Sequence, residues 1–261
     1  MTGPNLRERA IMDRRSVLSG LVAGSVLAGA GCTTTNPVTG RDQLILIDES
    51  QLSQAALQAW DQQVRETPTW NNRAAQARLE RVGMRIVSAA GLGNQQWEFR
   101  LFDTKDKNAF VLPANKVGFY RGLYEISDVD DWIGCVLGHE TGHVTGRHAA
   151  ERYSREMVTQ TALGVAGAAI HSDVARAALG MGAQVGLSLP FSREQEAEAD
   201  IIGIGYMHGA GYDVRQAIPF WQRMEASGGS RPPEFLSTHP NPDNRIQRIR
   251  DYINRQGWGP V

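Results

Sequence analysis

The sequence contains only two cysteines, Cys32 and Cys135. Two are too few for a disulfide framework, and they also exclude a cysteine-rich zinc site. Cys135 lies in an apolar segment, Trp-Ile-Gly-Cys-Val-Leu at residues 132–137, so we expect it to be a small buried hydrophobic side chain. Cys32 instead ends an apolar segment near the N-terminus.

An excess of charge of one sign is also missing. The 27 Lys and Arg residues nearly balance the 28 Asp and Glu residues, which gives a net charge of −1 and a pI of about 6.6. No basic patch supports nucleic-acid binding, and no block of like charge forms an interaction tail. The 261 residues contain no internal repeat and are enough for one domain with extensions.

The apolar runs are too short for a comfortable membrane span. Residues 17–31 have the length of the hydrophobic region of a secretory signal. The preceding Arg14-Arg15 pair resembles a twin-arginine signal, and an ordinary secretory signal is the alternative. Either Met1 or Met12 serves as the start. The Ala- and Gly-rich residues 158–189 are interrupted near 171–173 and predict two small-residue helices.

The end of the first apolar segment, Leu-Ala-Gly-Ala-Gly-Cys at residues 27–32, resembles a lipobox. In a lipobox, small residues precede a cysteine that is acylated and becomes the mature N-terminus. Gly29 stands where a branched aliphatic residue is usual, so cleavage to a soluble periplasmic protein is the alternative. Thr33 after Cys32 favours the outer membrane. We expect a signal peptide over 1–32, a lipid anchor at Cys32 and a periplasm-facing location in the cell envelope.

The remaining pattern predicts an α+β protein that is mostly helical with a small three- to four-stranded sheet. Residues 33–48 are expected to be a linker and a short strand, and residues 49–261 the main domain. We predict strands at 43–47, 97–102, 108–112 and 116–120 and helices at 50–66, 73–90, from 128 past 150, from 192 to 209 or 211, from 213 to 227–229, and after 242. Residues 117–120 are expected to be the sheet edge beside the helix that starts near 128.

That long helix carries the first motif, Gly-His-Glu-Thr-Gly-His at residues 138–143. His139 and His143 are four residues apart, so both imidazoles lie on one face of a helix and can bind one metal ion. Glu140 lies beside that face, within reach of a metal-bound water. The HExxH spacing therefore predicts two metal ligands and a general base.

A catalytic zinc needs a third protein ligand and an open position. Among the acidic residues at 194–200, Glu196 and Asp200 share one helix face, whereas Glu194 and Glu198 point roughly 200° away. We therefore predict that Glu196 binds the metal and that Asp200 accepts a hydrogen bond from a ligand histidine. Glu194 and Glu198 fit a solvated helix face.

These motifs together resemble a known family. HExxH is followed by Glu-x-x-Ala-Asp at 196–200, with Asn-Ala-Phe-x-x-Pro at 108–113 and Thr-His-Pro-x-x-x-x-Arg-Ile at 238–246. This combination, over residues 36–250, resembles the gluzincin family of HtpX, BepA and the CAAX prenyl proteases. Asn-Pro-Val-Thr-Gly-Arg at 36–41 is similar to its small envelope lipoprotein branch. The resemblance implies one zinc per chain, Glu196 as the third ligand, protein or peptide substrates and a role in envelope quality control.

This chain differs from members of that family in two ways. HtpX and the prenyl proteases have membrane helices, which this sequence lacks, and BepA has C-terminal helical repeats, whereas this sequence stops at Val261. We therefore expect a zinc metallopeptidase domain at 49–261, with envelope assembly machinery as a candidate partner, but do not transfer partner specificity from the family. A zinc-bound scaffold or holdase that cleaves nothing, or a prenyl-protein protease, is the rival function.

The remaining candidates concern the oxyanion and the other histidines. His239 and Arg245 are candidate oxyanion donors, and the resemblance suggests that His239 can alternatively occupy the fourth zinc position. His148, nine residues after His139 on an uninterrupted helix, is expected at the surface, and His171 and His208 lack ligand spacing. Gly138, Gly142 and Gly146 form a stripe that predicts close helix packing, and helix-ending glycines are the alternative.

Overall fold

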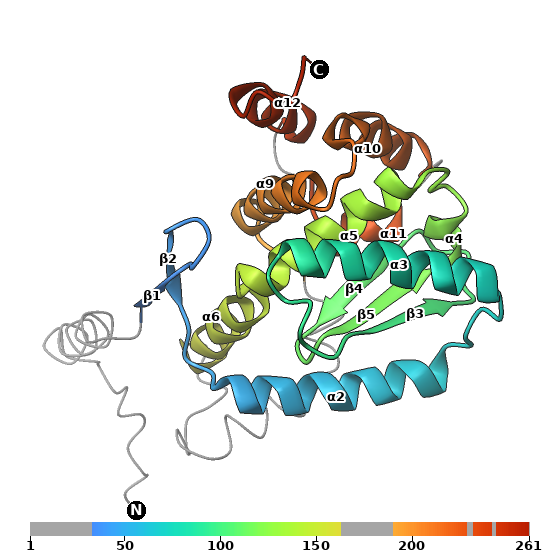
Figure 1. Ribbon diagram of the computed structural model, residues 1–261. Coiled ribbons are helices and arrows are strands. Elements are labelled where there is room, and N and C mark those ends of the chain that lie inside the picture. Colours follow the sequence, from blue (N-terminus) through green and yellow to red (C-terminus); the bar gives the residue numbers. More distant parts are fainter. Residues whose placement is uncertain (1–32, 163–189, 229–231, 242–243, 261) are drawn as a thin grey trace, which may run out of the picture.

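The computed structural model describes residues 33–162, 190–228, 232–241 and 244–260 (Figure 1). The predicted signal segment with Cys32, most of the predicted small-residue helices and His171 lie outside these residues. The elements, in chain order, are β1 (Thr33–Thr35), β2 (Asp42–Leu44), α2 (Glu49–Glu66), α3 (Arg73–Ala89), β3 (Glu98–Phe102), β4 (Ala109–Leu112), β5 (Lys116–Tyr120), α4 (Arg121–Tyr124), α5 (Asp130–Thr145), α6 (His148–Ala162), α9 (Arg193–Gly209), a 3-10 turn (Val214–Gln216), α10 (Ala217–Ala226), α11 (Glu234–Thr238) and α12 (Arg245–Arg255). This is the predicted mostly helical α+β class.

The main sheet has three strands in the order β3-β5-β4, with β3 parallel and β4 antiparallel to β5. The β4–β5 connection is a tight turn because Ala114 and Asn115 adopt positive φ, which matches the twist of the flanking strands. β5 is therefore the central strand, and the prediction that residues 117–120 form the edge is wrong. The edge nearest the helix with HExxH is β4, which packs against α5.

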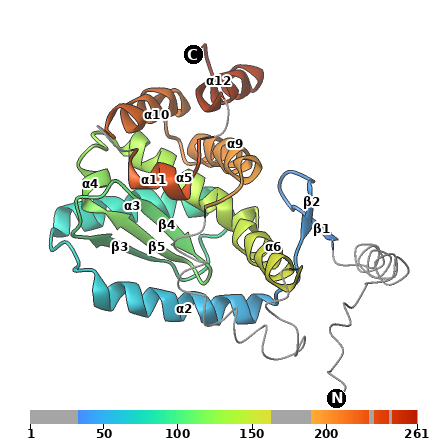
Figure 2. The same cartoon turned by 180° about the vertical axis from the view of Figure 1, so that it is seen from behind.

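Helices cover the two faces of the sheet (Figures 1 and 2). Alternate strand residues point to opposite faces, so Phe102, Phe110 and Leu112 pack against Trp60 of α2. The other face packs on α3, where Leu79 and its apolar neighbours belong to the main core. Helix α2 begins after the Asp48 cap and α3 after the Asn72 cap, whose side chains accept backbone N–H groups. The predicted helices at 50–66 and 73–90 are confirmed.

Helices α5 and α9 cross at very short distance because glycines face each other. A Cβ added to Gly138 would lie 2.7 Å from the carbonyl oxygen of Gly203, and one added to Gly142 would lie 2.9 Å from that of Ala199. These clashes confirm the predicted close packing at both positions. Gly146 instead fits the alternative of a helix-ending glycine, because it is the C-cap of α5.

The helix that carries HExxH is shorter than predicted. It begins at Asp130 with Val129 as N-cap, whereas Ser127 does not cap it and instead donates to the carbonyl of Leu123. It ends at Thr145, and Arg147 then adopts a φ of +55° that breaks the helix before α6 begins at His148. A residue beyond 146 therefore does not follow the helical phase of α5.

The predicted linker after residue 33 is a β-hairpin instead. β1 pairs with β2 in antiparallel register, and the second strand stops at Leu44 rather than continuing to 47. Asn36 and Gln43 are both 1% exposed and donate to the carbonyl of Gly146. The hairpin therefore supplies partners for a backbone group at the end of α5 that the helix itself leaves unpaired.

The C-terminal part follows the predicted boundaries closely. Ser192 and Gln195 form a capping box at the start of α9, which ends at Gly209. Asp213 caps the short turn before α10, and α12 closes the described chain. The five-residue α11, just before His239, was not predicted. Among the described residues, no helix has both the length and the apolar character required to cross a bilayer.

Candidate metal centre

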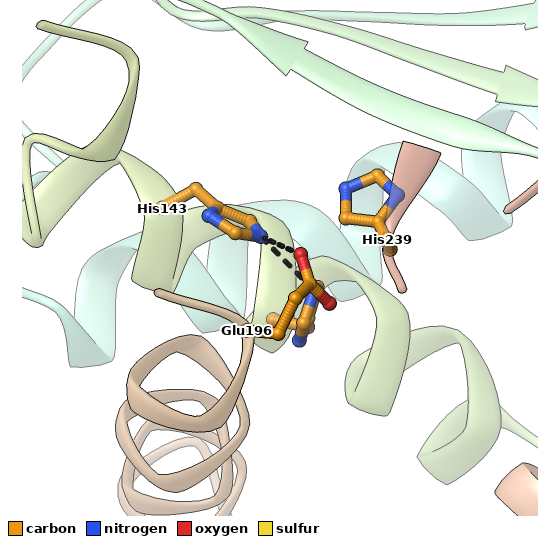
Figure 3. Close-up of side chains that lie close together, drawn as sticks. His143, Glu196 and His239 are labelled. Carbon is orange, nitrogen blue, oxygen red and sulfur yellow. Dashed lines mark hydrogen bonds and ion pairs between the residues drawn. The ribbon is translucent and has the colours of Figure 1, made fainter. Parts of the chain in front are cut away.

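Three predicted ligands meet between α5 and α9. Nε2 of His143 lies 3.0 Å from Nε2 of His139, and Glu196 places its carboxylate oxygens 3.4 Å and 3.3 Å from the same two nitrogens. Figure 3 shows Glu196 reaching toward His143, with His239 on the opposite side of the same space. All four side chains are almost completely buried and could hold one metal ion.

The spacing of these atoms fits a tetrahedral metal ion. Zinc bonds of about 2.0–2.1 Å in a tetrahedron separate the donor atoms by about 3.3 Å. Oε1 of Glu196 and Nε2 of His239 are buried and lack a hydrogen-bond partner among the described residues. A cation at the centre of the cluster would satisfy both atoms, so the residues present fit the ion.

The electrostatics of the cluster also favour a positive charge at its centre. Burial opposes the charged form of His139, but the carboxylates of Glu196 and Asp200 outweigh it and raise the pKa of His139 to about 10. Burial lowers the pKa of His143 well below its usual value. The site therefore stabilises one positive charge between the histidines and the carboxylate, which a bound metal ion supplies.

Asp200 lies beside the ligand histidine His139, as its position one helical turn after Glu196 predicted. Nδ1 of His139 lies 2.9 Å from Oδ1 of Asp200, and since a carboxylate only accepts, this nitrogen donates and Nε2 keeps its lone pair for a metal. Arg245 lies behind both carboxylates and donates at 2.7 Å to Asp200 and to Glu196. These contacts engage Nε and Nη2 of Arg245, whereas its buried Nη1 has no hydrogen-bond partner among the described residues. The role of Arg245 as an oxyanion donor stays a prediction.

His148 and Glu198 are also parts of the centre, which corrects two predictions. His148 is fully buried rather than at the surface, and its Nδ1 lies 2.9 Å from Nδ1 of His143. Its Nε2 lies 3.2 Å from Glu198, whose side chain is only 12% exposed. The surface assignment assumed one helix through residue 150, whereas the break at Arg147 turns His148 back toward His143. The signal for this break was Gly146, a glycine at the position of a helix C-cap. Glu194, by contrast, is solvent-exposed as predicted.

Glu140 lies between the metal cluster and the sheet edge. Its side chain is 2% exposed, and burial raises its pKa to about 8. The Val111 amide on β4 faces the carboxylate and lowers that pKa. Oε1 of Glu140 lies 3.4 Å from Nε2 of His239. The carboxylate is thus placed beside the cluster without belonging to the set of ligand atoms.

His239 follows α11 and points into the cluster. Its ring stacks on Phe235 at 4.1 Å, and burial lowers its pKa to about 3, so the imidazole is neutral. His208 lies apart from the cluster and stacks on Trp258. Of the described histidines, the structure therefore brings His139, His143, His148 and His239 together.

A cleft of about 330 Å³ opens beside His143. Its walls come from α2, the turn after β4, the start of α6 and the segment before α9, and include Leu52, Val111, Pro113, His143, Ala150 and Phe191. The wall is mainly apolar, and the cleft adjoins both the cluster and the edge strand. An extended chain in this cleft would pass beside His143 and Val111.

The sequence has recognisable relatives. Residues 73–253 match peptidase family M48. The mitochondrial metalloendopeptidase OMA1 of Schizosaccharomyces pombe is 34% identical over 179 residues, which are 67% of this chain and 52% of that protein. OMA1 of Bos taurus is 31% identical over 82% of this chain and 45% of its own length. The β-barrel assembly-enhancing protease of Escherichia coli K12 is 32% identical over 68% of this chain and 38% of its own length. The matches therefore span only about half or less of each of these relatives.

Proposed function

Because the chain belongs to peptidase family M48, we propose that it is a zinc-dependent endopeptidase that acts on envelope proteins that are misfolded or misassembled. The observation that carries the peptidase proposal is the buried Glu140 beside three convergent ligand atoms. A structural metal site has no need of a buried carboxylate that is not a ligand, and burying such a group is costly.

The residues of the chain have distinct roles in this proposal. His139, His143 and Glu196 would hold one zinc ion. When bound, the ion would polarise the scissile carbonyl and lower the pKa of a bound water molecule. Glu140 takes a proton from the attacking water and delivers it to the leaving amine. Burial raises the pKa of Glu140 above the usual range of a glutamate, which makes it a stronger base for the first step. Asp200 orients His139 through the bond to Nδ1.

The edge of β4 provides a place for the substrate backbone. The amide of Tyr120 donates to the carbonyl of Asn108, so Phe110 and Leu112 continue the bonds to β5. The N–H and C=O groups of Val111 then point to the free edge beside Glu140. We propose that an extended substrate adds to this edge as a strand and places a side chain in the cleft beside His143.

The location is proposed from the N-terminal segment alone. Residues 1–32 combine a twin-arginine pair, an apolar segment and the lipobox-like end at Cys32. We propose export and lipid attachment to the outer membrane, which would place the enzyme beside envelope proteins. The similarity to a β-barrel assembly-enhancing protease supports this substrate class, whereas the similarity to mitochondrial proteases supports peptide hydrolysis only.

The Glu140→Gln variant tests the proposal. It should retain about one zinc per chain, because Glu140 is not a ligand, and should lose cleavage of unfolded protein by several orders of magnitude. Metal analysis and a protease assay with a denatured envelope protein measure the two properties. Activity within tenfold of the wild type would disprove the role of Glu140, and a wild type that binds zinc but cleaves nothing would favour the scaffold or holdase function.

A further inference from the structure

His148 joins a ligand histidine to the N-terminal hairpin. It contacts His143 through Nδ1 and Glu198 through Nε2. Nε of Arg41 donates at 2.9 Å to Oε2 of Glu198, the oxygen that His148 also contacts, and the Thr39 hydroxyl donates to Oε1. A continuous row of hydrogen bonds therefore runs from residues 39–41 of the hairpin to the metal cluster.

The guanidinium at the far end of this row is held firmly. Arg41 forms a bidentate pair with Glu151 of α6, with N–O distances of 2.9 Å and 2.7 Å. Glu151 is fully buried and also accepts from Gln195. Bidentate charge-assisted bonds are strong and geometrically specific. Arg41 therefore joins the start of α6 to Glu198 on α9 in a fixed geometry.

Each hydrogen bond in this row has a defined donor and a defined acceptor. Glu198 accepts a bond from the Thr39 hydroxyl and is ion-paired with the guanidinium of Arg41, so it is present as a carboxylate. As a carboxylate it can only accept, so Nε2 of His148 must donate to it. With its proton on Nε2, His148 offers Nδ1 as an acceptor, and Nδ1 of His143 donates to it. Nε2 of His143 consequently presents its lone pair to Glu196 and the metal position.

The ring of His143 is also held in place by its surroundings. Phe191 stacks on it at a centroid distance of 3.8 Å and an interplanar angle of 19°. Stacking fixes the plane of the ring but does not distinguish the two orientations related by a flip of roughly 180° about χ2, so a directional bond is needed to fix which ring atoms face the ligands. His139 receives the corresponding support from Asp200. The two ligand histidines therefore have different supports, a carboxylate for His139 and a neutral imidazole for His143.

From this geometry we propose that His148 is a positioning residue that fixes the tautomer and orientation of His143, with Arg41 and Glu198 extending this support to the N-terminal hairpin. The proposal rests on the proposed function, because it assumes that His143 binds zinc. It gives residues 39–41 a role in supporting a metal ligand, which is separate from membrane attachment and from substrate binding. The hairpin thereby becomes part of the metal centre although it lies about 100 residues before it in the sequence.

Two substitutions at His148 separate positioning from packing. His148→Leu keeps apolar volume but offers no acceptor, whereas the amide oxygen of His148→Asn can take the place of Nδ1 as acceptor. A packing role favours leucine, because a buried amide is costly. A positioning role favours asparagine. The variants are made in full-length Glu140→Gln protein to prevent self-cleavage, and zinc affinity is measured by competition with a chelator, with the folding of the zinc-free proteins checked by circular dichroism.

We expect His148→Leu to bind zinc 10- to 100-fold more weakly than the parent, as is typical for loss of a partner behind a ligand, and His148→Asn to recover most of this loss. Glu198→Gln should weaken zinc binding severalfold, and the matched variant of an exposed neighbour, Glu194→Gln, should not. Equal or tighter zinc binding by His148→Leu than by His148→Asn would overturn the proposal while leaving the proposed function intact. Absence of zinc from the parent protein would overturn both.

Discussion

A guanidinium nitrogen of Arg245 lies 2.7 Å from a carboxylate oxygen of Glu196, and both side chains are almost fully buried. The same guanidinium pairs with Asp200. Two carboxylates therefore share one cation behind the cluster, and a metal ion would add a second positive charge in front of it. The pairing gives Arg245 a structural task that differs between the metal-free and metal-loaded protein.

Replacing Arg245 with methionine should therefore destabilise the metal-free protein more than the zinc-loaded one. Loss of one partner of a buried pair costs about 3–5 kcal/mol, but bound zinc compensates the charge of Glu196. We expect zinc to raise the melting temperature of the variant by more than it raises that of the wild type. Calorimetry with zinc and with EDTA measures this difference. Equal destabilisation in both conditions would show that Arg245 acts through packing alone.

The ligand role of Glu196 is tested with a control on the same helix. Glu196→Ala should lose zinc because a ligand atom is removed, whereas Glu194→Ala should retain about one zinc per chain because its side chain is exposed. From the sequence, Glu198→Ala would have been the neutral control, but the contact with His148 excludes it. Metal analysis after gel filtration measures both variants, and zinc retained by Glu196→Ala would require a different third ligand.

The metal ligands were accessible to sequence reasoning because their spacing is local. The i, i+4 rule places His139 with His143 and Glu196 with Asp200 on single helix faces, whatever the rest of the fold does. The β4–β5 hairpin was accessible for the same reason. His148 was not, because one left-handed residue at Arg147 changes the direction of every later side chain. The position of β5 between β3 and β4 depends on non-local strand pairing, which alternation alone does not specify.

The position of the substrate backbone is tested at Val111, because the sheet edge beside α5 is β4, whereas the strand predicted to be that edge, β5, is central. Val111→Pro removes the outward N–H without removing a bond to β5, a position where proline is tolerated. We expect KM to rise severalfold or more. Val111→Ala is the matched control, since it keeps the N–H and loses only side-chain volume. Equal kinetic constants for the two variants would place the substrate elsewhere.

The proposed lipid anchor is tested by Cys32→Ser. Cys32 closes the apolar segment of the predicted signal, and its replacement should release the protein from membranes while peptide cleavage in solution is unchanged. Metabolic labelling with a fatty acid gives the direct measurement, followed by membrane fractionation. A wild type that carries no label would favour cleavage to a soluble periplasmic enzyme, which is the alternative for this segment.

His239 carries the final prediction, because its orientation distinguishes two roles. Nδ1 of His239 lies 3.0 Å from the Thr238 hydroxyl and 3.3 Å from the carbonyl of Phe235. The carbonyl can only accept, and with the proton on Nδ1 the lone pair is on Nε2. Nε2 is one of the four convergent ligand atoms. This tautomer supports a latch in which His239 takes the fourth zinc position and excludes the catalytic water. An oxyanion donor would instead need the proton on Nε2.

The two roles predict opposite effects for His239→Ala. With a latch, the variant should cleave peptides or itself faster than the wild type and bind zinc more weakly, because a fourth ligand is lost. With oxyanion support, the barrier should rise by about 2–4 kcal/mol. We expect the latch. Initial rates on a peptide substrate, measured at saturating zinc, separate the outcomes, with Glu140→Gln as the inactive reference. Lower activity with zinc retained would assign His239 to the oxyanion. If His239 blocked the position of the catalytic water, its removal would speed the reaction and not slow it.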